Sequence, residues 1–260
     1  MKQIILLLLL FSFDNTYSQF LNRANITFSE NGSIIENPLT GGLNSCQFSE
    51  IDINIDGIKD LFVFDRTGDR ILPFICSMEG EVANYDYAPQ YIKNFPELNS
   101  WALIIDYNCD NKEDIFTYNQ SFVRVYINTS NNDSLSFEIS TEAIVSDYTS
   151  IISPIFISFV DIPSIIDVDN DGDLDILTFQ QSGGNIEYHQ NQSMEIYGNC
   201  DSLAFELNTD CWGNFFEGLN SYDLNNCNDQ TRAPSIERRT SSHSGSSLLA
   251  LDIDGDNDKD

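Results

Sequence analysis

Four nine-residue segments of this chain align with one another without gaps and share one acidic pattern. They occupy residues 52–60, 106–114, 167–175 and 252–260, and we call them loops one to four in chain order. Positions 1, 3, 5 and 9 of the loops are Asp52, Asn54, Asp56, Asp60, Asp106, Asn108, Asp110, Asp114, Asp167, Asp169, Asp171, Asp175, Asp252, Asp254, Asp256 and Asp260. The fold must therefore hold several carboxylates close together at each loop, and such groups repel one another unless a cation neutralises them.

The spacing within each loop is typical of calcium coordination. Ca²⁺ takes about six to eight oxygen ligands, and a tightly wound loop turns the side chains at alternate positions inward. Positions 1, 3, 5 and 9 then supply side-chain oxygens, position 7 supplies its carbonyl, and Gly or Asn at position 6 tolerates positive φ. We expect up to four Ca²⁺ sites, and Mg²⁺ fits less well because it retains its waters.

A plainer alternative is that the loops are solvated turns of Asp, Asn and Gly that bind no ion. Loop two is the weakest candidate, because Asn111 replaces Gly at position 6 and Cys109 lies inside the loop. Its occupancy stays open at this point. Loop three is the strongest candidate, with five Asp residues among its nine positions.

The sequences beside the loops predict β-strands rather than the helices of an EF-hand. An EF-hand loop carries a bidentate Glu at position 12, whereas that position is Val63, Thr117 or Thr178 here. Short apolar runs rich in aromatic and β-branched residues flank the loops without a helical period. These runs are 48–51, 101–105, 162–166 and 248–251 before the loops, and 61–64, 115–118 and 176–179 after them.

The loops recur at intervals of 54, 61 and 85 residues, which suits one four-stranded propeller blade per loop. We predict an all-β fold of β-propeller blades, each with about four antiparallel strands and a calcium loop between strands. The expected boundaries are 40–97 for blade 1, 98–157 for blade 2, 158–246 for blade 3 with a Cys-containing insertion at about 195–230, and 247–260 for the start of a truncated blade 4. Three blades and part of a fourth make an incomplete propeller, so we expect a fragment of a longer protein.

The amino terminus has the pattern of an export signal. Lys2 precedes an apolar run at 4–13 that is too short to cross a bilayer as a helix. We predict a signal peptide at 1–18, cleaved near Ser18–Gln19, and a lead-in segment at 19–39. The alternatives are an uncleaved anchor or a buried amino-terminal strand. We expect the mature chain to be secreted, in the medium or at the cell surface, with no membrane span.

Export makes structural disulfides plausible. The six cysteines are Cys46, Cys76, Cys109, Cys200, Cys211 and Cys227. Pairing of Cys211 with Cys227 or with Cys200 would pin a long loop, and the remaining connectivity stays open. No pair has the CxxC spacing of a zinc or redox site.

The motif Asp-x-Asp/Asn-x-Asp-Gly-x-x-Asp-Leu/Ile, clearest at 52–61 and 167–176, resembles the FG-GAP and VCBS repeats of integrin-α-like β-propellers. Residues 41–52 and 246–256 are similar to secreted bacterial proteins of this class, many of which end in a type IX secretion sorting domain. The likeness covers about residues 40–260 and implies that the matching Asp and Asn residues bind calcium and hold the strands of each blade together. The Phe-Gly and Gly-Ala-Pro signatures and a sorting domain are not evident, so the resemblance implies an architecture and not a ligand.

The charge of the chain limits its partners. With 41 Asp and Glu against 12 Lys and Arg, the net charge of -29 repels nucleic acid and anionic membranes and attracts cations. His189 and His243 lie in no HExxH or GxSxG motif, so we expect no catalytic residues and no enzymatic activity, and His189 is expected to be an ordinary strand residue. We expect a secreted calcium-binding scaffold for binding or adhesion, whose partner is an extracellular protein or a glycan. The alternative is the non-catalytic propeller part of an extracellular polysaccharide-degrading enzyme whose catalytic domain lies outside this sequence.

Overall fold

The computed structural model describes residues 26–181, 184–217, 222–224, 227, 247–256 and 259. The expected signal peptide at 1–18, His243 and Asp260 lie outside the described residues. The chain divides into two compact units, Met1–Pro38 and Leu39–Asp260. The first unit contains a short hairpin of β1 (Ser29–Glu30) and β2 (Ser33–Ile34).

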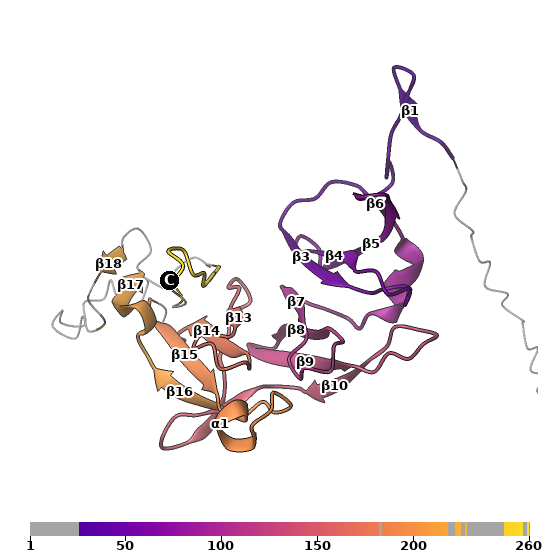
Figure 1. The fold of residues 1–260 in the computed structure, drawn as a ribbon. Helices are drawn as coiled ribbons and strands as arrows, with labels where there is room; N and C mark the ends of the chain where they lie inside the picture. The colour runs from indigo at the N-terminus through magenta and orange to yellow at the C-terminus, as the bar shows by residue number, and fades with distance from the viewer. Residues whose placement is uncertain are drawn as a thin grey trace, which may run out of the picture. The chain divides into compact units, whose positions relative to one another are not determined.

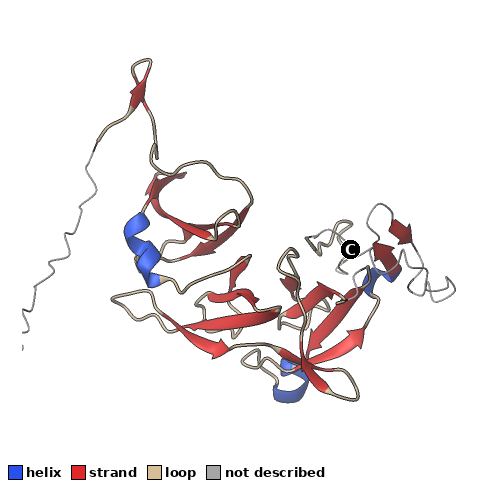
Figure 2. Cartoon of the chain, turned by 180° about the vertical axis from the view of Figure 1, so that it is seen from behind, coloured by secondary structure: helices blue, strands red, loops and turns tan. Residues whose placement is uncertain are grey.

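The second unit is built from antiparallel β-sheets, which confirms the predicted all-β class (Figures 1 and 2). The strands of the first sheet lie side by side in chain order: β3 (Cys46–Ile51), β4 (Asp60–Asp65), β5 (Arg70–Glu79) and β6 (Val82–Tyr87). Strand β4 has the sequence DLFVFD and is almost entirely buried, whereas the edge strand β6, VANYDY, is exposed over most of its length. The uninterrupted apolar run therefore occupies an inner strand, where both faces are covered.

The second sheet repeats this arrangement. It contains β7 (Ala102–Ile105), β8 (Asp114–Asn119), β9 (Phe122–Asn128) and β10 (Phe137–Thr141), again adjacent in chain order. A 3₁₀ helix, η1 (Pro89–Asn94), connects the first sheet to the second and begins with a proline, which suits the first turn of a helix.

The third sheet has six strands, two more than the predicted four. Four of its strands pair antiparallel in chain order: β13 (Ser164–Ile166), β14 (Asp175–Phe179), β15 (Ile186–Asn191) and β16 (Phe205–Thr209). The sheet continues beyond β16 with two more strands, β11 (Val145–Asp147) and then β12 (Ile152–Pro154). Strand β11 runs parallel to β16. Thus β16 lies within the expected insertion at 195–230, and β11 and β12 lie within the range expected for blade 2.

A short helix explains how β16 reaches this sheet. Helix α1 (Ser193–Tyr197) follows β15 and ends at Gly198, whose φ of 70° is readily adopted by glycine. The returning chain is held by the side chain of Asn191, which donates to the carbonyl of Ser202 at 3.1 Å and accepts from the N–H of Ala204 at 3.0 Å. The chain then pairs with β15 as β16. Beyond it lie η2 (Trp212–Asn214) and a hairpin of β17 (Phe215–Glu217) and β18 (Tyr222–Leu224).

Apolar clusters lie between consecutive sheets and hold them together. One joins Phe62 and Phe64 of the first sheet to Ile104 and Ile115 of the second. Equivalent clusters join the second sheet to the third, and the third to Leu248 and Ala250 before loop four. Burying one large apolar side chain contributes about 1.5–3 kcal/mol, so these clusters are the main source of stability between sheets.

Hydrogen bonds reinforce the junction between the first two sheets. The N–H groups of Ala102 and Ile104 in β7 donate to the side chains of Gln47 and Ser49 in β3, at 3.0 and 3.2 Å. The first strands of the two sheets therefore lie beside each other. Because each acidic loop directly follows such a first strand, this packing also fixes where loops one and two lie.

Candidate metal centres

Loops one, two and three each connect the first strand of a sheet to its second strand. They follow β3, β7 and β13, and their position 9 is the first residue of β4, β8 or β14. Strands therefore flank the loops, as the sequence predicted, and helix–loop–helix packing is excluded at these three loops.

The loop backbone turns sharply at two positions. Positive φ at position 6 was predicted and is found at Gly57, Asn111 and Gly172, with values of 86°, 66° and 106°. The backbone at position 4 is also left-handed. The sequence did not reveal this, because the four loops carry four different residue types at that position. These residues and their φ angles are Ile55 (60°), Cys109 (59°), Asn170 (62°) and, in loop four, Gly255 (80°). A β-branched residue such as Ile55 rarely adopts this conformation, so the rest of the loop must stabilise it.

The carboxylate at position 1 organises the turn. In loop one, Asp52 accepts hydrogen bonds from the N–H groups of Asp56 at 3.0 Å and Gly57 at 2.8 Å. The same two bonds recur in loop two at 3.3 and 2.9 Å, and in loop three at 3.1 Å each. The side chain at position 5 then accepts from the N–H of position 7 in all three loops, at 2.8 to 3.0 Å. These contacts wind the chain so that the acidic side chains gather on its inner side.

The aspartate at position 9 has a structural role that the sequence did not predict. Asp60, Asp114 and Asp175 are at most 1% exposed. Each accepts one N–H from position 2 of its own loop, at 2.8 to 3.2 Å, and one from the third strand of its sheet, at 2.7 or 2.8 Å. The donors on the third strands are Cys76, Asn128 and Asn191. Position 9 therefore ties each loop to a strand that is distant in sequence.

Loop three brings its predicted ligands together most closely. Oxygens of Asp167, Asp169 and Asp175 lie within 4.8 Å of one another. A second group shares Asp169 and adds Asp171 and Glu195, again within 4.8 Å. Glu195 belongs to α1 and lies outside the motif, so the loop sequence contained no signal for it.

Two carboxylate oxygens in loop three are buried without a partner. They are Oδ2 of Asp171 and Oδ1 of Asp173, and Asp173 as a whole is 1% exposed. The other oxygen of each carboxylate is satisfied, by the N–H of Asp173 at 3.0 Å and by that of Met194 at 2.9 Å. A buried carboxylate oxygen that lacks a donor costs free energy, and binding a cation would remove that cost.

The pKa values of these groups reflect the same deficit of positive charge. Burial, together with the repulsion of neighbouring carboxylates, raises the pKa of Asp175 to about 7 and the pKa values of Asp173 and Asp114 to about 6. Backbone N–H donors act in the opposite direction at all three groups. Burial and like charge prevail, so the native loops favour protonation or a bound cation.

The remaining loops gather their predicted ligands less completely. In loop four, Asp252, Asp254 and Asp256 lie within 4.8 Å and are all exposed. Within the described part of the chain, loops one and two bring no three carboxylates that close, since their position 3 is an amide. In loop one, the amide of Asn54 donates to Asp56 at 2.8 Å, where a carboxylate would repel.

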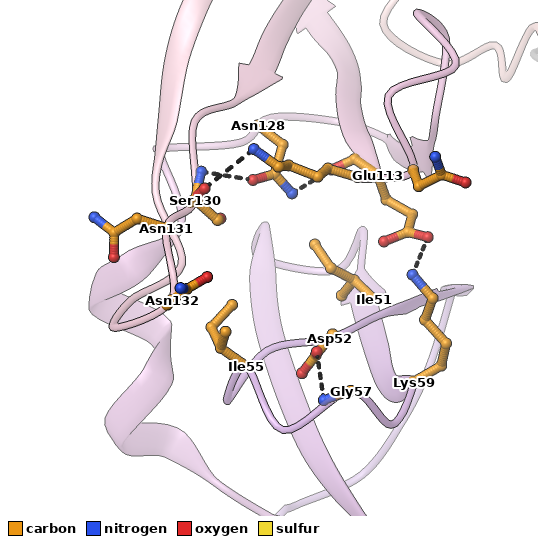
Figure 3. Close-up of a pocket in the computed structure, with 12 residues that line it drawn as sticks. Ile51, Asp52, Ile55, Gly57, Lys59, Glu113, Asn128, Ser130, Asn131 and Asn132 are labelled. Carbon is orange, nitrogen blue, oxygen red and sulfur yellow. Dashed lines mark hydrogen bonds and ion pairs between the residues drawn. The ribbon is translucent and has the colours of Figure 1, made fainter.

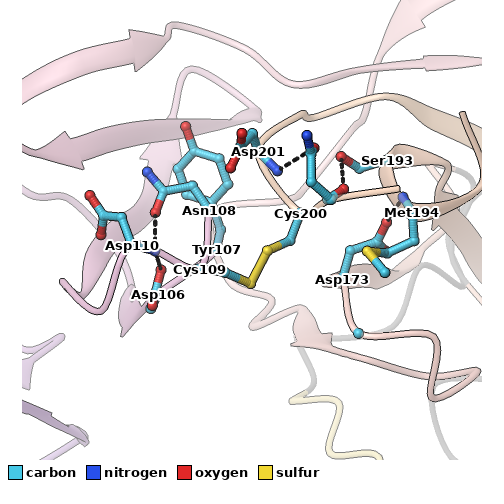
Figure 4. The surroundings of a disulfide bond; sticks show 12 residues. Asp106, Tyr107, Asn108, Cys109, Asp110, Asp173, Ser193, Met194, Cys200 and Asp201 are labelled. Atoms are coloured by element: carbon cyan, nitrogen blue, oxygen red, sulfur yellow. Dashed lines mark hydrogen bonds between the residues drawn. A yellow bond between two sulfur atoms is a disulfide. The ribbon is translucent and has the colours of Figure 1, made fainter. Parts of the chain in front are cut away.

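One of the two disulfides in the structure lies at an acidic loop. Cys109, at position 4 of loop two, is bonded to Cys200, which follows α1, so the disulfide connects loop two to the segment beside Asp173 and Met194 (Figure 4). This pairing was not anticipated. Cys211 is bonded to Cys227, one of the two pairings left open for it, while Cys46 and Cys76 are free thiols.

His189 is fully buried in β15, where its ring nitrogens lie 2.9 Å from Ser146 Oγ and 3.2 Å from Glu187 Oε2. These contacts fit the predicted role as a strand residue. No described helix is long and apolar enough to cross a membrane.

Comparison with known proteins gives one family match. Residues 106–178 match the model of a family described as FG-GAP-like repeat, which runs from position 1 of loop two through loop three into β14. No curated protein and no solved structure matches the chain. The matched segment contains loops two and three and the strands β8 to β10 of the second sheet, so this part of the β-rich chain is similar to an FG-GAP-like repeat.

Proposed function

We propose that this chain is an extracellular repeat protein that binds calcium through its acidic loops and serves as a scaffold for binding or adhesion. The observation that carries the proposal is the arrangement of loop three. Oxygens of Asp167, Asp169 and Asp175 lie within 4.8 Å of one another, as do oxygens of Asp169, Asp171 and Glu195, and Asp171 Oδ2 is buried without a donor.

The donors in loop three suit Ca²⁺. Asp167, Asp169, Asp171 and Asp175 would hold the ion, and every donor is a hard oxygen of the kind that Ca²⁺ prefers. A bound ion neutralises carboxylates that otherwise repel one another and stabilises the native state by mass action. Loops one, two and four would hold further ions through the matching residues, with fewer carboxylates at loops one and two.

We also propose that the three sheets are successive blades of a β-propeller. Support comes from the apolar clusters that join each sheet to the next, and from the FG-GAP-like match at 106–178. The two disulfides, together with that match, favour secretion, because disulfides persist in oxidising compartments.

Isothermal titration of the purified chain with CaCl₂ tests the proposal. We expect Kd values of about 10⁻⁴–10⁻³ M, typical of extracellular calcium modules, and much weaker binding of MgCl₂. Asp169→Ala removes a proposed ligand whose side chain is exposed, unlike the buried Asp175, so it should abolish or weaken one site while the fold survives. Asp86→Ala, an exposed carboxylate of β6, is the matched control. Unchanged calcium binding in Asp169→Ala, or no binding by the wild-type chain, would contradict the proposal.

A further inference from the structure

A pocket of about 330 Å³ lies between loop one and loop two (Figure 3). Its walls come from loop one, from residues 111–113 of loop two and from the connection between β9 and β10. Small-molecule sites have volumes of about 300–1,000 Å³, so this pocket has room for a compact ligand.

The charges around the pocket cancel, which is unusual for this chain. Two of the five lysines in the sequence, Lys59 and Lys112, line it together with Asp52 and Glu113. Lys59 forms an ion pair with Glu113, and Lys112 donates to the carbonyl of Ser130 at 3.1 Å. In a chain with a net charge of -29, this lining is formally neutral. It therefore suits an uncharged ligand better than a cation or a polyanion.

The uncharged lining combines carboxamides with an apolar surface. The half-buried Ile55 supplies the apolar surface among the polar groups of the pocket, whereas Ile51 is 1% exposed (Figure 3). Asn132 is exposed at the rim, and its carboxamide has no hydrogen bond to any described residue. A carboxamide both donates and accepts hydrogen bonds, so it can pair with a hydroxyl group in either direction. Hydroxyl groups around an apolar C–H face are the chemistry of a sugar ring.

We propose that this pocket binds an uncharged saccharide unit of a glycan. The inference deepens the proposed function and rests on it, because Asp52 is both a wall of the pocket and a proposed calcium ligand. Ile55 and Gly57 line the same pocket from positions 4 and 6 of loop one, where the backbone is left-handed. Calcium in loop one would hold this wall in place, so saccharide binding should require calcium.

The test is a glycan array probed with the purified chain in calcium, followed by titration of the best uncharged hit. The array should include uncharged, uronate-bearing and sulfated glycans. We expect retention of uncharged glycans, and Asn132→Ala should weaken the affinity about fivefold, the effect of losing one hydrogen bond. Asn84→Ala, which removes an exposed carboxamide from β6, should leave the affinity unchanged.

Calcium titration of the same preparations separates the proposal that the loops bind calcium from the proposal that the pocket binds a saccharide. If the chain binds calcium but retains no uncharged glycan, or retains only charged ones, the pocket inference is wrong and the proposed function stands. Equal affinities of Asn132→Ala and Asn84→Ala would also overturn the inference. If glycan is bound without calcium, the proposed coupling between loop one and the pocket fails.

Discussion

The buried carboxylates predict that stability depends on pH in opposite directions with and without calcium. The pKa of Asp175 is raised to about 7 in the native state, against 3.8 for an ordinary Asp. Between these values the native state binds more protons than the unfolded state. In calcium-free buffer the free energy of unfolding should therefore fall as the pH rises through this window.

The size of this effect follows from the pKa difference. Between pH 5.5 and pH 8, deprotonation of Asp175 alone should lower the free energy of unfolding by about 2 kcal/mol. Asp114 and Asp173, with pKa values of about 6, should together contribute a further 2 kcal/mol or so. Calcium reverses the trend, because the ion binds only ionised carboxylates and protons compete with it. In calcium, stability should rise with pH.

Urea unfolding at pH 5.5 and pH 8, with and without calcium, measures both trends. Asp175→Asn removes the titrating group, so its pH dependence in calcium-free buffer should be about 2 kcal/mol smaller than that of the wild type. The control Asp86→Asn, which removes an exposed carboxylate from β6, should keep the wild-type dependence. The reasoning is refuted if calcium-free wild type is more stable at pH 8 than at pH 5.5, or if Asp175→Asn and Asp86→Asn behave alike.

Further predictions concern the covalent links and the core. Replacing Cys109 and Cys200 by Ser should lower the free energy of unfolding by about 4–5 kcal/mol, because their disulfide spans 91 residues. The same change at Cys211 and Cys227, which are 16 residues apart, should lower it by about 3 kcal/mol. Non-reducing urea melts of the two double variants check this order, and the reverse order would contradict it. Trp101→Ala should lower the free energy of unfolding by about 3–5 kcal/mol in the same assay, because Trp101 is fully buried between the second and third sheets. A loss below about 1 kcal/mol would show that this core is not tightly packed.

The features predicted correctly from sequence depend on residues that are close together in the chain. Alternate Asp and Asn, Gly or Asn at position 6, and aromatic or β-branched runs on either side were enough to place three loops between strands. The all-β class followed, because such short runs cannot form amphipathic helices. These signals are local, so neither long-range pairing nor burial was needed to interpret them.

The features that were missed depend on long-range contacts. Asp175 looked like one more ligand, yet it also binds the N–H of Asn191, 16 residues further on. Glu195 approaches loop three only because α1 turns the chain back beside it. The pairing of Cys109 with Cys200 and the addition of β11 to the third sheet likewise join segments far apart in sequence, and no local pattern reports such contacts.

The central claim is that loop three encloses a hard divalent cation, and anomalous diffraction from crystals grown in calcium tests it most directly. The account predicts an ion within about 2.3–2.6 Å of carboxylate oxygens from Asp167, Asp169, Asp171 and Asp175. A well-ordered loop three without an ion at millimolar calcium, or with these carboxylates turned towards solvent, would contradict it.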